Sequence, residues 1–329
     1  MFRGKLLQLT FIHRYVLAAG FALIATAAPA QDYPNRPITL MVGLAAGGIT
    51  DVTARLYAEA VSKTIGQRVT IENKTGAGGG VAAAYVQNAA PDGYTLLVFS
   101  GSQHATVPAV GNAGYEPVKG FSPITYLFNA VVVLTVPADS PVKTMKELHD
   151  WGRKKPGGLS VGTPGLGSPS HLLGAKIFLA DKVPVEMVHY RGGAPMMADL
   201  ITGRVDVAWP TLSTSRAYLA DGKLRALALD ADARWAPLPD APTLVELGFA
   251  KERVASWFAL AGPAGMPPAL VAKIRDMFIQ ASKDPELQRR LGENGTPIVS
   301  STPEEMGRAM AAEWETMQVL AKTLNLRQP

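Results

Sequence analysis

The chain has 329 residues, no cysteine and a formal net charge of +5. Three basic residues and no acidic residue lie in residues 1–30, so the remainder carries 29 basic and 27 acidic side chains. This balance is too even for a nucleic-acid-binding surface. About 300 residues are enough for two domains that each bury a core, so the chain does not need disulfides for stability.

The first 30 residues have the pattern of a secretory signal peptide. Basic residues up to Arg14 precede the apolar stretch 15–27, and Ala28-Pro29-Ala30 follows. The apolar run is too short for a typical membrane span. We therefore expect cleavage after Ala30 and export to the periplasm. A lipoprotein anchor is not expected, because it needs a cysteine at the cleavage site.

The first strand–helix unit is organised around the glycine-rich turn Gly43–Asp51. The turn follows the apolar run Ile38–Val42, which is typical of a buried strand, and it precedes apolar residues at helical spacing. Such a turn directs free backbone N–H groups and the positive end of a helix dipole at one place, which suits an anion. A nucleotide is not expected, because the G-x-G-x-x-G spacing and the phosphate-loop lysine are absent. The alternative is a tight turn that simply needs glycine.

Strand and helix patterns alternate through the rest of the sequence. Further strands are expected at 68–72, 94–99, 159–162, 185–190, 205–209 and 224–228. Repeated strand–helix–strand units predict parallel sheets with helices on both faces. The long apolar runs 130–136 and 254–261 are interpreted as strands that cross between two domains.

These patterns predict an α/β fold with two lobes, each a mainly parallel sheet flanked by helices, joined by two crossing hinge strands. Lobe 1 is expected to comprise residues 31–131 and 254–329, and lobe 2 residues 132–253. The final helix, from Thr302 to about Leu324, begins with the capping box of Thr302 and Glu305. Thr144 is placed to cap an earlier helix.

Three later turns resemble the first one in composition. They contain glycines and hydroxyl side chains, have few charged residues and precede helices. They lie at 100–104, 163–171 and 191–195. The carboxyl ends of parallel strands line the ligand crevice of α/β proteins, so the turns predict a neutral, donor-rich site for a carboxylate. Helix capping is the alternative role of Thr50, Asp51, Ser168 and Ser170. Arg191 is either an anion partner or an ordinary exposed arginine.

Serine and histidine side chains close together in sequence could indicate an enzyme and not a binding protein. Ser168 and Ser170 lie near His171, and Ser102 lies near His104, but no G-x-S-x-G elbow is present. The histidines lack metal-ligand spacing. We expect no catalytic residue, metal or cofactor, and we interpret Met196 and Met197 as core residues of a short helix.

Several motifs occur in a fixed order from Tyr33 onward. They include Tyr33-Pro34-x-Arg36-Pro37, Gly47-Gly48-x-Thr50-Asp51, Ala90-Pro91-Asp92-Gly93-Tyr94, Tyr190-x-Gly192-Gly193-Ala194-Pro195 and Gly203-x-Val205-Asp206-Val207. With these motifs the chain resembles the periplasmic solute-binding receptors of tripartite tricarboxylate transporters, the Bug-type receptors. The resemblance implies a Venus-flytrap receptor that closes on a small carboxylate and delivers it to a membrane permease.

The resemblance also implies where the ligand binds. Carried over by position, the ligand-binding residues are Leu44, Ala45, Gly47, Gly48, Thr50, Ser100, Ser102, His104, Thr163, Ser168, Ser170, His171, Arg191, Gly192 and Ala194. Asp51, at the same helix start as Thr50, completes the predicted set. The chain departs from the family where Gly43–Ala46 replace a Pro-Phe-x-Pro run. Leu44 and Trp209 then suggest a less polar ligand, such as an aromatic or branched acid.

The sequence thus predicts a periplasmic receptor for a small organic acid that works with the permease subunits of such a transporter. It is expected to be a monomer, to bind no nucleic acid and to catalyse no reaction. The alternatives are a ligand sensor for a signalling partner and a serine hydrolase.

Overall fold

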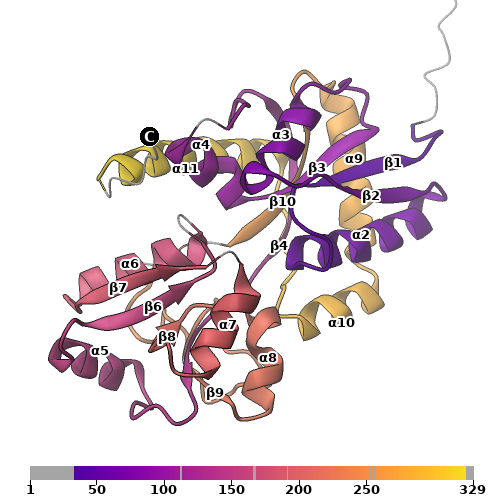
Figure 1. Ribbon diagram of the computed structural model, residues 1–329. Coiled ribbons are helices and arrows are strands. Elements are labelled where there is room, and N and C mark those ends of the chain that lie inside the picture. The colour runs from indigo at the N-terminus through magenta and orange to yellow at the C-terminus, as the bar shows by residue number, and fades with distance from the viewer. Residues whose placement is uncertain are drawn as a thin grey trace, which may run out of the picture. The chain divides into compact units, whose positions relative to one another are not determined.

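The computed structural model describes residues 33–111, 113–165, 168–190, 192–251, 254 and 256–323 (Figure 1). Residues 37–329 form one compact unit, to which every element named below belongs. The predicted signal peptide and the predicted contact Arg191 lie outside the described residues. Within the described part of the chain, no helix has the length and apolar character that crossing a membrane requires.

Five strands form the first sheet, in the order β2-β1-β3-β10-β4. Their bounds are Ile38–Val42 (β1), Val69–Asn73 (β2), Thr95–Ser100 (β3), Phe121–Asn129 (β4) and Trp257–Pro263 (β10). Strand β1 is parallel to β2 and β3, whereas β10 is antiparallel to β3 and β4. The apolar runs of β1, β3 and β10 suit strands that are buried on both faces.

Helices cover both faces of this sheet (Figure 1). On one face, Tyr57 of α2 stacks on Phe278 of α9 and donates a hydrogen bond to the Leu127 carbonyl at 2.8 Å. On the other face, α3 and α11 bury Ala83 and Met310 with the sheet residues of one core cluster. The helices associated with this sheet are α2 (Ile49–Ile65), the 3₁₀ turn η1 (Ala77–Gly79), α3 (Gly80–Gln87), the π-helical η2 (Ser102–Thr106), α4 (Val107–Val110), α9 (Pro268–Ala281), α10 (Pro285–Glu293) and α11 (Pro303–Thr323).

The second sheet repeats this order as β7-β6-β8-β5-β9. Its strands are Val132–Pro137 (β5), Leu159–Thr163 (β6), Val185–His189 (β7), Val207–Ala208 (β8) and Leu224–Asp230 (β9), and its helices are Met145–Lys154 (α5), Pro169–Ala180 (α6), Gly193–Ile201 (α7) and Leu212–Ala220 (α8). Strand β6 is parallel to β7 and β8, and β5 is antiparallel to β8 and β9. Strands β1 and β6 are therefore topological equivalents, as are the helices α2 and α6 that follow them.

The expected crossing run at 130–136 consists of a two-residue link followed by strand β5. Strand β4 ends at Asn129 and β5 begins at Val132, so Ala130 and Val131 carry the chain from one sheet to the other. The N–H of Ala130 donates to the Ser256 carbonyl at 2.7 Å, which joins the outgoing segment to the returning one. Both sheets are mixed because the strands β10 and β5 run antiparallel to their neighbours. The exact bounds of the lobes stay a proposal.

Two helix starts follow the sequence prediction. Thr144 caps α5 by accepting from the N–H of Glu147 at 3.1 Å. At the start of α11, the N–H of Glu305 donates to Thr302 Oγ1 at 3.1 Å, and the N–H of Thr302 donates to Glu305 Oε2 at 2.8 Å. The predicted capping box is confirmed.

Candidate ligand-binding site

The start of α2 has no side-chain cap. Its N-cap is Gly48, preceded by Gly47 in the left-handed region at φ +82°, and the first helical hydrogen bond runs from Val52 N–H to the Gly48 carbonyl at 2.9 Å. In the described part of the chain, the N–H groups of residues 49–51 have no hydrogen-bond acceptor. The hydroxyl of Thr50 is also buried without a partner there. This helix start therefore has donors available for an anion.

Asp51 stabilises the turn from within. Its carboxylate accepts from Gly47 N–H at 2.9 Å, from both Nε and Nη2 of Arg55 at 3.0 and 2.9 Å, and from Asn73 Nδ2 at 3.0 Å. Burial alone raises the pKa of Asp51, but the hydrogen bonds from Arg55, Gly47 and Asn73 and the Arg55 charge together lower it. The carboxylate is thus occupied by the protein, as expected of a helix-start residue.

The turn after β3 is closed by Gln103, which the sequence analysis did not single out. Gln103 Oε1 accepts from the N–H of Ser100 at 3.3 Å, and its Nε2 donates to the Gly79 carbonyl at 3.4 Å. A Cβ on Gly79, whose φ is +97°, would lie 2.0 Å from Gln103 Nε2, and one on Gly43 would lie 2.5 Å from it. Glycine at both turns therefore makes room for the buried amide.

The structure places His104 inside the protein. Its side chain is 1% exposed, and its Nε2 forms a 2.8 Å hydrogen bond with the Met310 carbonyl of α11. Burial is the main cause that lowers the pKa of His104, so the ring is neutral at pH 7. Ser102, the first residue of η2, is only partly buried. Of these two predicted contacts, only Ser102 retains an exposed surface.

In the second sheet, hydroxyl groups of the turn after β6 form hydrogen bonds with nearby protein groups. Thr163 is fully buried, and its Oγ1 forms a 2.8 Å hydrogen bond with His189 Nδ1. Ser168 is the N-cap of α6, because its Oγ accepts from the N–H of His171 at 3.2 Å. Capping, which the sequence left open for Ser168, is therefore its observed role. Ser170 is 3% exposed.

His171 and His189 face each other across this turn. Their ring centroids are 4.6 Å apart at an interplanar angle of 76°. Burial, followed by the neighbouring His189, lowers the pKa of His171 to about 4. Both histidines are thus neutral near pH 7, since burial also lowers the pKa of His189. The turn presents no cationic imidazole to a ligand at this pH.

The starts of α7 and α8 lie side by side. The N-cap of α7 is Gly192, in the left-handed region at φ +112°, and no side chain caps this helix. A Cβ on Gly193 would lie 3.1 Å from Thr214 Cγ2 of α8. The hydroxyl of Thr211 is hydrogen-bonded to those of Ser213 and Thr214 at 3.0 and 2.7 Å. The starts of α7 and α8 and a set of hydrogen-bonded hydroxyl groups therefore lie next to each other.

One pocket joins the start of α2 to the start of α8. It has a volume of about 300 Å³ and is lined by Gly47, Gly48, Ile49, Val52, Thr53, Ser213, Thr214 and Asn294. Two of these residues, Gly47 and Gly48, belong to the set predicted from sequence. None of the lining residues is charged, so an anion here would be held by neutral donors. The volume suits a small organic molecule.

The sequence analysis missed Ser213, Thr214 and Asn294. No local motif marks them, and they come from segments far from the glycine-rich turns in sequence. It was wrong about Trp209, which was expected to influence ligand polarity, because this side chain is 0% exposed and belongs to a core cluster. Met196 and Met197 are buried core residues of α7, as predicted.

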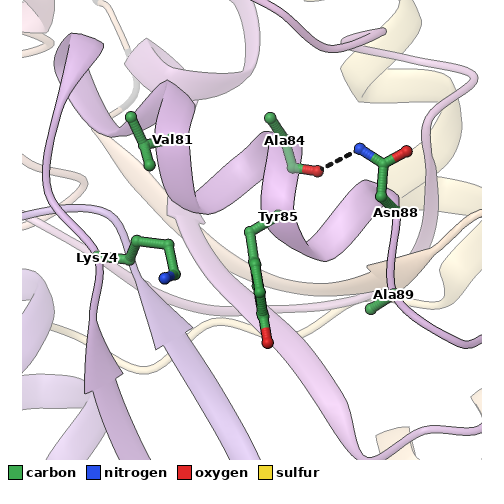
Figure 2. A pocket seen from close by; sticks show the side chains of 6 residues that line it. All are labelled: Lys74, Val81, Ala84, Tyr85, Asn88 and Ala89. Carbon is green, nitrogen blue, oxygen red and sulfur yellow. Dashed lines mark hydrogen bonds between the residues drawn. The ribbon is translucent and has the colours of Figure 1, made fainter.

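A larger open pocket, of about 560 Å³, lies over the outer surface of α3 (Figure 2). Figure 2 shows Lys74 beside Tyr85, whose ring centroid lies 4.7 Å from the Lys74 ammonium nitrogen. Asn88 Nδ2 donates to the Ala84 carbonyl at 2.7 Å, so this amide is already engaged. None of these residues belongs to the predicted ligand-binding set.

Metal ligands are not clustered in the described residues, where no group of three or more His, Cys, Asp or Glu side chains could hold an ion. The arrangement that is present combines two mixed sheets with glycine-rich helix starts at the carboxyl ends of parallel strands. Solved structures similar to this chain are two-lobed periplasmic binding proteins, so the predicted fold class is confirmed.

Several solved structures are similar to this chain over nearly their whole length, among them the following three. The periplasmic binding protein BugD is 32% identical, with 90% of this chain and 100% of that chain covered and a TM-score of 0.76. Rpa4515 from R. palustris, solved with adipate, is 33% identical, with 89% and 98% covered and a TM-score of 0.79. MatC from Rhodopseudomonas palustris, with bound malate, is 31% identical, with 87% and 99% covered and a TM-score of 0.74.

The family model of the tripartite tricarboxylate transporter family receptor matches residues 53–326. The chain belongs to this family of periplasmic solute-binding receptors, and the resemblance to Bug-type receptors is confirmed.

Proposed function

We propose that this protein captures a small organic carboxylate by hinge closure and presents it to the permease of a tripartite tricarboxylate transporter. The main support is the uncapped start of α2, whose residues Gly47, Gly48 and Ile49 line a pocket without charged side chains. The next residue, Thr50, has a buried hydroxyl without a partner in the described part of the chain. A carboxylate satisfies these donors and interacts favourably with the helix dipole. The relatives solved with adipate and malate make dicarboxylates the first ligands to test.

The proposed contacts are narrower than the set predicted from sequence, which stays a prediction. They comprise the backbone N–H groups of residues 49–51, the Thr50 hydroxyl, the hydroxyls of Ser213 and Thr214, and the Asn294 amide. The start of α7, which touches Thr214, adds the N–H groups of residues 193 and 194. Asp51 and Thr163 are left out, because protein partners already engage their polar atoms. His104 is left out because its side chain is buried and its Nε2 bonds to the Met310 carbonyl.

A ligand panel with one side-chain change tests this proposal. The purified protein is screened by thermal unfolding and calorimetry against malate, adipate, citrate, branched and aromatic acids, and matched neutral amides. At least one acid should raise the melting temperature in proportion to its concentration, because it binds only the folded state. Binding by the amides and by none of the acids would overturn the proposal.

Thr50→Val then removes the unpartnered hydroxyl with little change in shape. We expect the affinity for the best acid to fall about 10- to 100-fold, because a hydrogen bond to a charged group contributes about 1.5–3 kcal/mol. The matched control is Thr64→Val, near the other end of α2, where the hydroxyl bonds only to the Ala60 carbonyl. Equal losses in both variants would mean that the effect is structural.

The transport role is tested in cells. Deleting the gene should abolish uptake of the labelled acid, and a copy that encodes the wild-type chain should restore it. A sensor for a signalling partner would instead leave uptake intact and abolish the transcriptional response to the acid. Turnover of an ester or amide panel that is lost in Ser170→Ala would support the hydrolase alternative.

A further inference from the structure

Glu313 of α11 lies at the edge of the first sheet where the turn after β3 begins. Its Oε2 accepts a 2.7 Å hydrogen bond from Trp257 Nε1, at the first residue of β10. A Cβ on Gly101 would lie 3.0 Å from Glu313 Oε1. The β10–β3 register pairs Phe258 with Ser100. The C-terminal helix therefore places a carboxyl group against the turn that carries the predicted contacts Ser100 and Ser102.

This position and the start of α2 lie at the same end of the first sheet, because the parallel strands β1 and β3 both finish there. Strand β3 is next to β1, and β10 follows β3 in the sheet. Neighbouring strands are about 5 Å apart, so Glu313 lies roughly 10 Å from the carboxyl end of β1, which leads to α2. When two like charges are on the order of 10 Å apart in surroundings of intermediate dielectric constant, their repulsion is enough to change an affinity about 3- to 10-fold.

No cation balances Glu313 within the described part of the chain, where it forms no ion pair. Trp257 packs against Tyr126 of β4 and His104 of η2, with ring centroids 5.3 and 5.8 Å away. Burial raises the pKa of Glu313 to about 7, and the hydrogen bond from Trp257 opposes this shift.

The other titratable groups nearby keep one charge state around pH 7. Burial, and then the charge of Glu313, raise the pKa of Tyr126 to about 12, while burial lowers that of His104. On α6, whose Leu172 joins the cluster containing Met317 of α11, His171 has a pKa of about 4. The residues three and four positions from Glu313 on α11 are not titratable. Glu313 is thus the group around Trp257 that changes charge between pH 6 and 8.5.

We infer that Glu313 controls the affinity of the proposed carboxylate site, which admits the anion when this side chain is neutral and opposes it when ionised. The inference rests on the proposed function, because it needs a bound carboxylate. Binding of the anion and protonation of Glu313 are linked, so ligand binding should take up a fraction of a proton above pH 7.

The test measures dissociation constants for malate and adipate by calorimetry between pH 6 and pH 8.5, where both acids are largely ionised. The dissociation constant of the wild-type protein should rise about 3- to 10-fold across this range. In Glu313→Gln it should stay constant and close to the wild-type value at pH 6, since glutamine keeps an acceptor for Trp257 and carries no charge. The matched control is Glu315→Gln, an exposed glutamate on the same helix, which should follow the wild type.

The possible results separate the two proposals. Binding without a pH slope, or with the same slope in Glu313→Gln, would overturn the inference and leave the proposed function standing. Failure of every acid in the panel to bind would overturn both. If Glu313→Gln does not fold, the inference is tested on the wild-type protein. Calorimetry in buffers of different ionisation enthalpy then measures how many protons are taken up when the acid binds. Proton uptake at pH 7.5 supports the inference, and its absence contradicts it.

Discussion

The second strand in the order of each sheet, β1 or β6, is followed by a helix, yet the two helices begin differently. In the first sheet, α2 starts at Gly48 and no side chain accepts from its first N–H groups. In the second, α6 starts at Ser168, whose hydroxyl accepts from the N–H of His171. The two positions are equivalent in the order and direction of their strands. At equivalent positions, the first sheet therefore has a helix start whose N–H groups are not capped by a side chain, which we call open. The second sheet has a helix start capped by a serine, which we call closed.

The difference separates two functions of a helix start. A serine cap satisfies the backbone and stabilises the helix by about 1 kcal/mol, but it removes a donor from any ligand. A glycine at the N-cap leaves these donors available at some cost in stability. The glycine-capped starts of α2 and α7 are thus candidates for ligand contact, whereas the capped start of α6 is mainly structural.

Closing the open start gives the largest expected effect. Gly48→Asp introduces a carboxylate that caps α2 and competes with the ligand, both for the N–H groups and by charge. Gly48 has φ −74°, which any residue can adopt, and a Cβ there would approach the Ala45 carbonyl at 3.3 Å. We expect carboxylate affinity to fall at least about 100-fold, or roughly 2.7 kcal/mol, with thermal stability unchanged or raised.

Gly48→Ala is the control for this change, because it adds the Cβ without the carboxylate. Calorimetry with the best acid of the panel should show a much smaller loss for alanine than for aspartate. If both variants bind as the wild type does, the start of α2 is not the anion site.

The locally determined features of the fold could be predicted from the sequence. Capping is a contact between residues three apart, so Thr144 with Glu147, and Thr302 with Glu305, are visible in the chain itself. The alternation of strands and helices likewise predicted the two sheets. Two antiparallel crossing strands were expected from the sequence. Their pairing partners in each sheet were not, because pairing depends on the path of the whole chain.

The site could be predicted only in part, since its walls come from distant segments. Asn294 and Thr214 line a pocket with Gly48, but nothing near them in sequence distinguishes them. His104 looked like a ligand contact beside Ser102, yet the carbonyl of Met310, 206 residues away, engages its ring. Glu313 depends in the same way on Trp257, which is 56 residues away. Contacts of this kind need the tertiary structure.

A second prediction concerns what keeps the open turn in shape. Asp51→Asn removes the charge that holds Arg55 and the N–H of Gly47, and we expect it to cost about 1–2 kcal/mol at pH 7. Because the folded pKa of Asp51 is depressed, its contribution is present above pH 3.8 and is lost as the pH falls below that value. Denaturation at pH 7 and pH 3 should therefore show a smaller difference between variant and wild type in acid. Asp150→Asn, in an exposed pair with Lys146, should have less effect at pH 7.

The smallest effect on ligand affinity is expected at Ser168, at the closed start of α6. Its measurement distinguishes helix capping from ligand contact at this residue. Ser168→Ala removes the hydroxyl that accepts from His171 N–H, so we expect a loss of about 1 kcal/mol in unfolding free energy. Carboxylate affinity should change less than about threefold, because the serine satisfies its own helix. The control is Thr144→Ala, which removes the equivalent cap of α5. Its loss of unfolding free energy shows how much a purely structural cap contributes. A tenfold or greater loss of affinity without a change in melting temperature would show instead that Ser168 contacts the ligand, and the two helix starts would then share one function.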